Sequence, residues 1–211
     1  MADVCNDQLR HSNLQSPHLE EFVDSVERGD DARTEEAALA VGGLGDAALP
    51  VLRDLLASTD SDRRWWVVRT LAAVGTVAAR ELLVAALEDP DPAVRVCAAQ
   101  GLGELRAEEA VAGLVRRMAD SSPLVSRVAA DGLARIGSPA VPALIAALQA
   151  GEVQARAGAA RALRFIRPPE AIADEYIRAL CAALDDPSAI VTYYADEALE
   201  QMGVGFVFFR P

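Results

Sequence analysis

Lysine is absent from this sequence, and positive charge is scarce. Its 20 basic side chains, all arginines, face 32 acidic ones, which gives a formal net charge of −12. Nucleic acids and anionic membrane surfaces repel a chain of this charge. No run of about 18 apolar residues occurs either, so we expect no transmembrane helix. The sequence therefore predicts a partner that is neither nucleic acid nor membrane.

Histidine is almost as scarce, which argues against the commonest kinds of catalysis. The chain has two, His11 and His18, both near its start. A Ser-His-Asp or Cys-His site would need a histidine inside the fold. Metalloprotease and nucleophile-elbow motifs are missing, and the glycine-rich residues 42–45 lack the lysine of a phosphate-binding loop. We expect no catalytic, cofactor-binding or metal-binding residue, and hence no enzyme.

The cysteines are few and far apart. Cys5, Cys97 and Cys181 form no CxxC pair, and an odd number at wide spacing argues against a disulfide framework. The start of the chain is polar and has no signal-peptide pattern. We therefore expect a reducing compartment and a cytoplasmic location.

Alanine, leucine and valine are abundant and are arranged in a repeat. Apolar residues make up 52% of the chain but aromatic ones only 5%. One leucine-like position recurs at steps of 30, 31, 31, 30 and 36 residues, at Val41, Leu71, Leu102, Leu133, Leu163 and Leu199. Self-similarity at this period is typical of a solenoid, in which each unit buries its apolar face against the next.

Each copy of the repeat divides into two apolar stretches with helical spacing. The first stretches are 17–29, 46–58, 77–89, 108–120, 139–151 and 170–186. Between stretches, Asp, Ser and Pro are signals for a helix start, as in 89-DPDP-92. The pattern predicts about six helix-turn-helix units over residues 17–203, between a flexible arm at 1–16 and an apolar tail at 204–211.

One stretch carries the motif of a known family. Residues 94–103, VRVCAAQGLG, with their Val-Arg, Ala-Ala and Gly-Leu-Gly elements, resemble the short HEAT-like repeats of the phycobilisome-lyase type. The resemblance implies an all-α fold, a right-handed α-solenoid of about six HEAT-like repeats. It also implies that the repeat arginine, present as Arg64, Arg95 and Arg156, bonds to turn backbone or to a turn aspartate of the adjacent unit. Contact with a ligand is the alternative role for these arginines.

The resemblance further implies that the second helices line a concave face. On a helical wheel, the first, fourth, fifth and eighth residues after the arginine position point away from the core. The candidates for partner binding at these positions are Trp65, Arg69, Gln100, Arg127, Asp131, Arg161, Arg164 and Tyr193. Trp and Arg are enriched among interface hot spots, and Arg pairs bidentately with carboxylates.

This surface predicts a protein partner with an acidic or aromatic-bearing segment. Two alternatives stay open at this point. Trp65 could fill space between repeats, and the arginines could form local ion pairs on a solvated face.

The apolar tail holds Phe206, Phe208 and Phe209. A solenoid has open apolar ends that need covering, so these side chains could fold back over the last repeat. The alternative is insertion into a partner or into a second copy of the chain.

Three functions are compatible with these patterns. We favour a non-catalytic scaffold or adaptor that binds another protein. The family resemblance also allows an accessory subunit of a bilin lyase that acts on a phycobiliprotein. Related helical repeats occur in DNA-repair glycosylases, but those need a strongly basic groove, and the net charge of −12 argues against one. The oligomeric state stays open.

Overall fold

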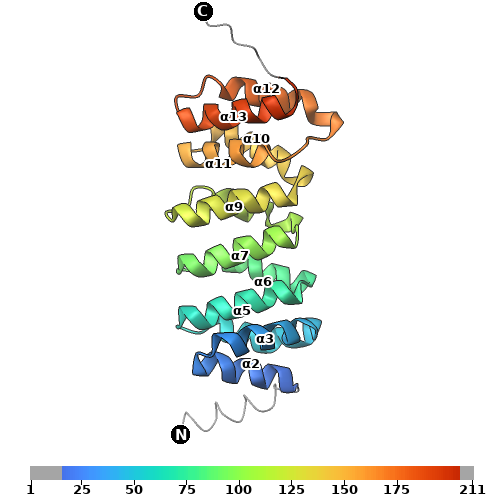
Figure 1. Ribbon diagram of the computed structural model, residues 1–211, viewed down its shortest axis with the longest axis vertical. Coiled ribbons are helices and arrows are strands. Elements are labelled where there is room, and N and C mark those ends of the chain that lie inside the picture. Colours follow the sequence, from blue (N-terminus) through green and yellow to red (C-terminus); the bar gives the residue numbers. More distant parts are fainter. Residues whose placement is uncertain (1–15, 205–211) are drawn as a thin grey trace, which may run out of the picture. The chain divides into compact units, whose positions relative to one another are not determined.

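The computed structural model describes residues 16–204, which form helices and turns without a β-strand in that range (Figure 1). The expected N-terminal arm and apolar tail lie almost wholly outside the described residues, and so do Phe206, Phe208 and Phe209. The chain divides into two compact units, with the boundary between Gly101 and Leu102.

The first unit consists of three helical pairs. Its helices are α2 (Pro17–Arg28), α3 (Asp31–Gly42), α4 (Leu49–Leu56), α5 (Ser61–Val74), α6 (Val77–Ala86) and most of α7 (Pro92–Glu104). A short 3-10 turn, η1 (Gly45–Ala48), leads into α4.

The second unit repeats the same plan. Its helices are α8 (Val111–Arg117), α9 (Pro123–Ile136), α10 (Val141–Ala150), α11 (Val153–Leu163), α12 (Ala173–Ala183) and α13 (Ala189–Gln201). The 3-10 turns η2 (Glu108–Ala110), η3 (Ser138–Ala140) and η4 (Glu170–Ile172) precede α8, α10 and α12. The predicted all-α fold of six helix-turn-helix HEAT-like repeats is confirmed, and the 3-10 turns are a detail that helical spacing does not reveal.

Helices begin and end where the sequence places capping residues. The Asp60 side chain accepts a hydrogen bond from the Asp62 amide at 2.9 Å, and Asp91 accepts one from the Ala93 amide at 2.7 Å. Each satisfies an amide that the first turn leaves without a helical partner. At the other end, α5 stops at Gly75, whose φ of 64° is favoured by glycine.

The leucine-like column forms the spine of the core. Its six members, Val41, Leu71, Leu102, Leu133, Leu163 and Leu199, are all at most 1% exposed. Around it lie mainly small residues, and the two large aromatic exceptions are Phe22 and Tyr176. The Tyr176 hydroxyl donates to the carbonyls of Leu163 and Ile166, and burial raises the pKa of this hydroxyl. Repeat alignment from the sequence alone therefore identified the core.

One expectation about exposure is wrong. The fourth residue after the arginine position is buried in five repeats, with at most 2% exposure at Ala38, Val68, Ala99, Ala130 and Ala160. In the second unit, α11 packs against both α9 and α13, so its buried surface is wider than a wheel with one apolar side allows (Figure 1). The equivalent Asp196 in α13 is exposed, and no later second helix follows it in the described chain.

Small residues also set how closely second helices approach one another. A methyl group added at Gly103 would lie 2.6 Å from the Cα atom of Gly132 in the second unit. In the first unit, one added at Gly42 would lie 3.1 Å from the backbone of Ala73. Real Cβ atoms almost never come within 3.0 Å of another heavy atom, so at Gly103 backbone would have to move.

No single helix in residues 16–204 is long and apolar enough to cross a membrane. One pair, α9 with the helical stretch Ser138–Ala150, passes on length and composition, but it is bent by 118°.

Replacing Gly103 with alanine is expected to destabilise the fold by roughly 1–3 kcal/mol, because the new Cβ meets the Gly132 backbone rather than a side chain that can rotate away. The direction is diagnostic, since alanine in a helix normally stabilises by about 0.5–1 kcal/mol relative to glycine. Urea unfolding followed by far-UV circular dichroism measures the change. A variant at least as stable as the wild type would show that this close approach is dispensable.

Candidate functional site

The repeat arginine of the second copy joins two successive turns. Arg64 Nε and one terminal nitrogen donate to the two carboxylate oxygens of Asp89, both at 2.8 Å, and the other terminal nitrogen donates to the Ser58 carbonyl at 3.0 Å. Asp89 also accepts the Asp91 amide at 2.8 Å. The Asp89 carboxylate thus accepts hydrogen bonds both from the backbone of its own turn and from the arginine of the preceding repeat.

The fifth copy repeats this arrangement in the second unit. Arg156 donates to Asp186 at 2.7 and 3.1 Å and to the Gly151 carbonyl at 3.0 Å, while Asp186 accepts the Ser188 amide at 2.8 Å. Arg95 in the third copy donates to the carbonyls of Asp89 and Pro90. These contacts with turn backbone and turn aspartates are of the kind that the family resemblance implies.

The same contacts change the acidity of the aspartates. Burial is the largest single influence on Asp89 and would raise its pKa. The hydrogen bonds from Arg64 and from the Asp91 amide, together with the charges of Arg64 and Arg95, outweigh burial and leave the pKa below the ordinary value of 3.8. The hydrogen bond from Arg156 likewise lowers the pKa of Asp186. Both aspartates are therefore held ionised by the neighbouring repeat.

The other predicted site residues lie along the exposed side of the second helices, which we call the second-helix ridge. In the first unit it comprises Glu35, Leu39, Trp65 and Arg69, and in the second unit Arg127, Asp131, Arg161, Arg164, Tyr193 and Glu197. Gln100, in α7, is exposed as well. The described helices thus bring most of the predicted partner-binding residues to a solvent-accessible surface.

Most ridge arginines are paired across repeats. Arg69 donates to Glu35 at 2.6 Å in the first unit. In the second unit Arg161 donates to Asp131 at 3.1 and 2.8 Å. Partial burial is the largest influence on Arg161 and lowers its pKa, but the hydrogen bond and charge of Asp131, together with Tyr194, outweigh burial and raise the pKa. The ridge cations thus help to join neighbouring repeats.

A second cluster on the ridge surrounds Arg164. Its guanidinium pairs with Glu197 and lies 4.4 Å from the centroid of Phe165 and 5.1 Å from that of Tyr194. Tyr193 is 56% exposed and donates to Glu197 at 2.9 Å.

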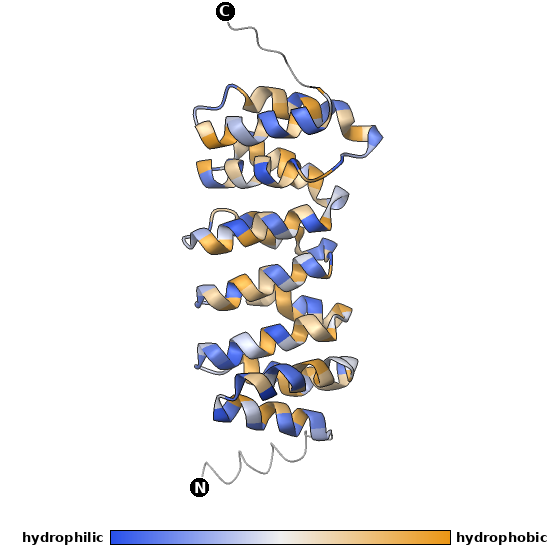
Figure 2. Ribbon diagram, viewed as in Figure 1, coloured by the Kyte–Doolittle hydropathy of each residue, from blue (hydrophilic) through white to orange (hydrophobic). Residues whose placement is uncertain are grey.

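Arg127 differs from the paired arginines Arg69, Arg161 and Arg164, because it is exposed and makes no ion pair with any residue in 16–204. Figure 2 shows hydrophilic and hydrophobic positions interleaved along α11 and α13.

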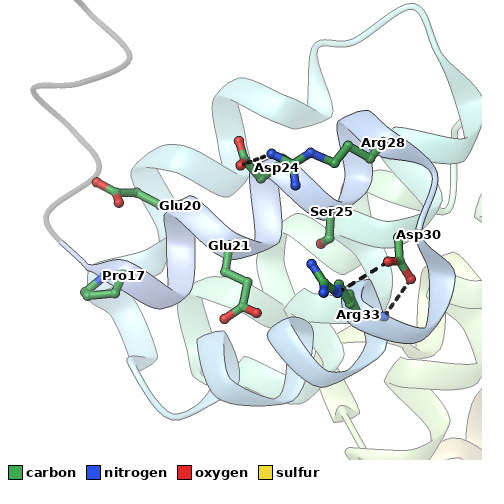
Figure 3. A pocket seen from close by; sticks show the side chains of 8 residues that line it. All are labelled: Pro17, Glu20, Glu21, Asp24, Ser25, Arg28, Asp30 and Arg33. Carbon is green, nitrogen blue, oxygen red and sulfur yellow. Dashed lines mark hydrogen bonds and ion pairs between the residues drawn. The ribbon is translucent and has the colours of Figure 1, made fainter.

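Surface hollows occur in both units. One of about 300 Å³ in the first unit is lined almost wholly by polar residues (Figure 3). Its two arginines already have partners, since Arg28 pairs with Asp24 at 2.9 Å and Arg33 with Asp30 at 3.5 Å. Another, of about 630 Å³ in the second unit, is lined by Phe165, Tyr176 and Met202 among others.

The third hollow contains both tryptophans of the chain. Trp65 and Trp66 meet edge to face, with centroids 4.9 Å apart and an interplanar angle of 86°. They line an open hollow of about 720 Å³, the tryptophan hollow, together with Val26, Glu27, Arg28, Gly29, Asp31, Asp60, Asp62 and Arg63. Trp65 therefore belongs both to the ridge and to this hollow. Across residues 16–204, no three His, Cys, Asp or Glu side chains gather as metal ligands would.

Comparison with known proteins places the chain in a family. The HEAT-repeat pattern matches residues 19–89, 62–125, 80–164 and 111–200, which together span nearly all of the described chain. The chain belongs to the HEAT-repeat family. The resemblance to repeats of the phycobilisome-lyase type, seen in residues 94–103, is confirmed by relatives whose names refer to a phycocyanin operon and to bilin biosynthesis.

One relative is the uncharacterized phycocyanin operon protein Z of Pseudanabaena tenuis, 33% identical over 109 residues, which are 48% of this chain and 54% of the relative. Another is the bilin biosynthesis protein RpcF of a Synechococcus, 37% identical over 75 residues, 36% of each chain. The HEAT-repeat chain thus spans about half of the first relative's length and about a third of the second's.

The fold of this chain is similar to the solved structure of an engineered protein over nearly the whole length of both chains. It has a TM-score of 0.51 and 24% identity, and the match covers 90% of this chain and 98% of that one. At this identity the similarity supports the fold and carries no information about the ligand.

Some features of the surface escaped the sequence patterns. Trp66, Asp31 and Asp62 share one hollow, although the wheel assigned none of them to the partner-binding face. The adjacent tryptophans at the start of a helix, followed by no other tryptophan in the chain, were the available signal. Their meeting with Asp31 depends on where three helix ends converge.

Replacing Asp89 with asparagine is expected to lower the free energy of unfolding at neutral pH by about 2 kcal/mol, because charge-assisted hydrogen bonds to Arg64 are lost. Asp54→Asn, at an exposed position in α4, is the matched control and should leave stability within about 0.5 kcal/mol of the wild type.

The difference should also depend on pH. A carboxyl whose pKa is lowered by folding stabilises fully above its unfolded value and loses that contribution as the pH falls through its folded pKa. The difference in the free energy of unfolding between wild type and Asp89→Asn should therefore become smaller as the pH falls below 3.8. Denaturant unfolding curves at a series of pH values measure this difference. A difference that does not change with pH would show that the ion pair between Asp89 and Arg64 is not its cause.

Proposed function

We propose that this HEAT-repeat protein is a non-catalytic module that binds another protein through the second-helix ridge. The observation that carries the proposal is that each unit exposes large side chains on the ridge or beside it. Leu39 is 60% exposed, Tyr193 is 56% exposed, and Phe165, next to Arg164, is 58% exposed. Exposed large side chains held on helices favour protein binding over small-ligand chemistry.

The chemistry of the partner segment is part of the same proposal. Pairing of Arg69, Arg161 and Arg164 within the chain weakens the case for a purely acidic segment. In the second unit, Arg127 can still donate hydrogen bonds to a carboxylate, and the Arg164–Phe165–Tyr194 cluster can stack with an aromatic ring. We propose a partner segment that combines an acidic with an aromatic side chain for this part of the ridge.

Affinity capture from a lysate of the native host, read by mass spectrometry, tests the ridge. Arg127→Glu combined with Tyr193→Ala is expected to reduce retention of the partner at least tenfold, which corresponds to about 1.4 kcal/mol. Arg178→Glu is the control for the change of charge, since Arg178 is exposed in the same unit but lies on the first helix α12, away from the ridge.

A partner retained by the control and lost by the double variant supports the proposal. Equal retention by all three proteins would move the binding surface elsewhere. If no protein is retained by any of them, the protein-binding function itself is wrong.

A second candidate function is an accessory subunit in bilin attachment to a phycobiliprotein. The observation that favours it is the pair of relatives whose names refer to a phycocyanin operon and to bilin biosynthesis, at 33% and 37% identity. Lyase subunits of this type would act together with a second HEAT-repeat chain, so this candidate is a special case of protein binding.

Absorbance separates the two candidates. If the chain serves bilin attachment, the complex captured from its host should contain another HEAT-repeat protein and show a visible absorbance band of a bilin. A captured complex that has neither a second HEAT-repeat protein nor bilin absorbance would argue for a protein-binding scaffold that is unrelated to bilin attachment.

A further inference from the structure

The tryptophan hollow has a shape that suits an inserted side chain. It lies where the C-terminal end of α2 meets the starts of α3 and α5. Gly29, which closes α2 with a φ of 67°, lines it, and a Cβ atom there would meet nothing within 4 Å. The hollow of about 720 Å³ falls within the range of about 300–1,000 Å³ usual for ligand pockets.

The two tryptophans give this hollow an aromatic wall. Both are partly exposed, in contrast to Val67 and Val68, the residues that follow them in α5 and are fully buried. Their edge-to-face contact at 4.9 Å fixes the rings against each other and leaves ring surface open to the hollow. Indole faces are the best of the aromatic surfaces for binding a cation.

The charges around this wall are unbalanced. The lining contains four carboxylates, Glu27, Asp31, Asp60 and Asp62, against two guanidiniums, Arg28 and Arg63. Both guanidiniums have partners, since Arg28 lies 2.9 Å from Asp24, and Arg63 lies 3.9 Å from Glu27 and 3.7 Å from Asp60. The lining thus carries an excess of negative charge.

Two of the carboxylates are available for a cation from outside. Asp31 and Asp62 are exposed and form no ion pair with the described residues 16–204. They lie in the first turns of α3 and α5, where the helix dipole favours an anion without a cationic partner. Residues 16–36, which include Asp31, have eight acids against two arginines, so the field around this part of the chain attracts cations.

We infer that the tryptophan hollow docks an arginine-bearing, basic segment of a partner protein. The guanidinium stacks on the open face of one of the two indoles, Trp65 or Trp66, and donates hydrogen bonds to Asp31 and Asp62. Arginine suits this site better than lysine, because its planar group can stack and donate at the same time. This inference rests on the proposed protein-binding function and assigns the first unit a basic ligand, in contrast to the second unit.

The fluorescence of the chain gives a direct test. Trp65 and Trp66 are its only tryptophans, so emission excited at 295 nm reports on the hollow alone. The probe is an acetylated and amidated tetra-arginine peptide, with tetra-glutamate as the charge-reversed control. Tetra-arginine should produce a saturable change in emission that weakens with added salt, and tetra-glutamate should produce none.

A pair of matched variants separates local binding from general attraction. Asp31→Asn with Asp62→Asn should weaken the apparent Kd for tetra-arginine at least tenfold. Asp54→Asn with Glu81→Gln removes the same amount of charge from exposed positions outside the hollow and should weaken it less than threefold. Equal loss in both variants, or no saturable signal in the wild type, would overturn the inference.

Capture distinguishes this inference from the proposed function. A host protein retained equally by wild type and by Asp31→Asn/Asp62→Asn leaves protein binding intact but overturns the docking of a basic segment here. A protein lost only from this variant, and found to bind through an arginine-containing segment, supports both. Peptide binding without capture of any protein would overturn the function while supporting the chemistry of the hollow.

Discussion

The structure depends on a simple constraint, that one helical pair of this length cannot bury its own apolar surface. Each second helix must therefore pack against the second helices of its neighbours as well as against its own first helix. In the second unit α11 packs on both α9 and α13. As a consequence, small residues are fully buried at the third and fourth positions after the arginine position of the repeat. Ala129 and Ala130, which follow Ser126 at that position, are examples. At Gly103 and Gly132 the two helices approach so closely that there is no room for even a Cβ atom on Gly103.

Stacking also accounts for how the polar residues are used. Asp89 and Asp186 each receive an arginine from the preceding repeat, while their own turns supply a backbone amide. On the ridge, Arg69 and Arg161 again join one repeat to the previous one. Charges that look like a binding surface in the sequence therefore serve first as links between repeats. The exposed residues without such links, Arg127, Asp31 and Asp62, are more informative about partners.

The sequence was sufficient for the parts of the fold that repeat. The column from Val41 to Leu199 is buried throughout, because the same environment recurs at each step of the repeat. It was insufficient where a residue has neighbours on several sides. A wheel gives one inner and one outer face, so it placed Ala130 and Ala160 outside although neighbouring helices cover them. It also could not bring Asp31 and Trp66 together, because their contact with one hollow is set by the meeting of α2, α3 and α5.

A repeat fold alone says little about its ligand, since the same frame serves many partners. Chemical specificity must come from positions where one repeat departs from the others. Tryptophan occurs in this chain only near the start of α5, in the second repeat. The hollow beside it combines an indole wall with two carboxylates, Asp31 and Asp62, that form no ion pair with the described residues. Such a departure is not needed for stacking, because no other second helix has tryptophan at the equivalent position. The residues there are Glu35, Val96, Arg127, Ala157 and Tyr193. The irregular residues of a regular fold are thus the best guide to what it binds.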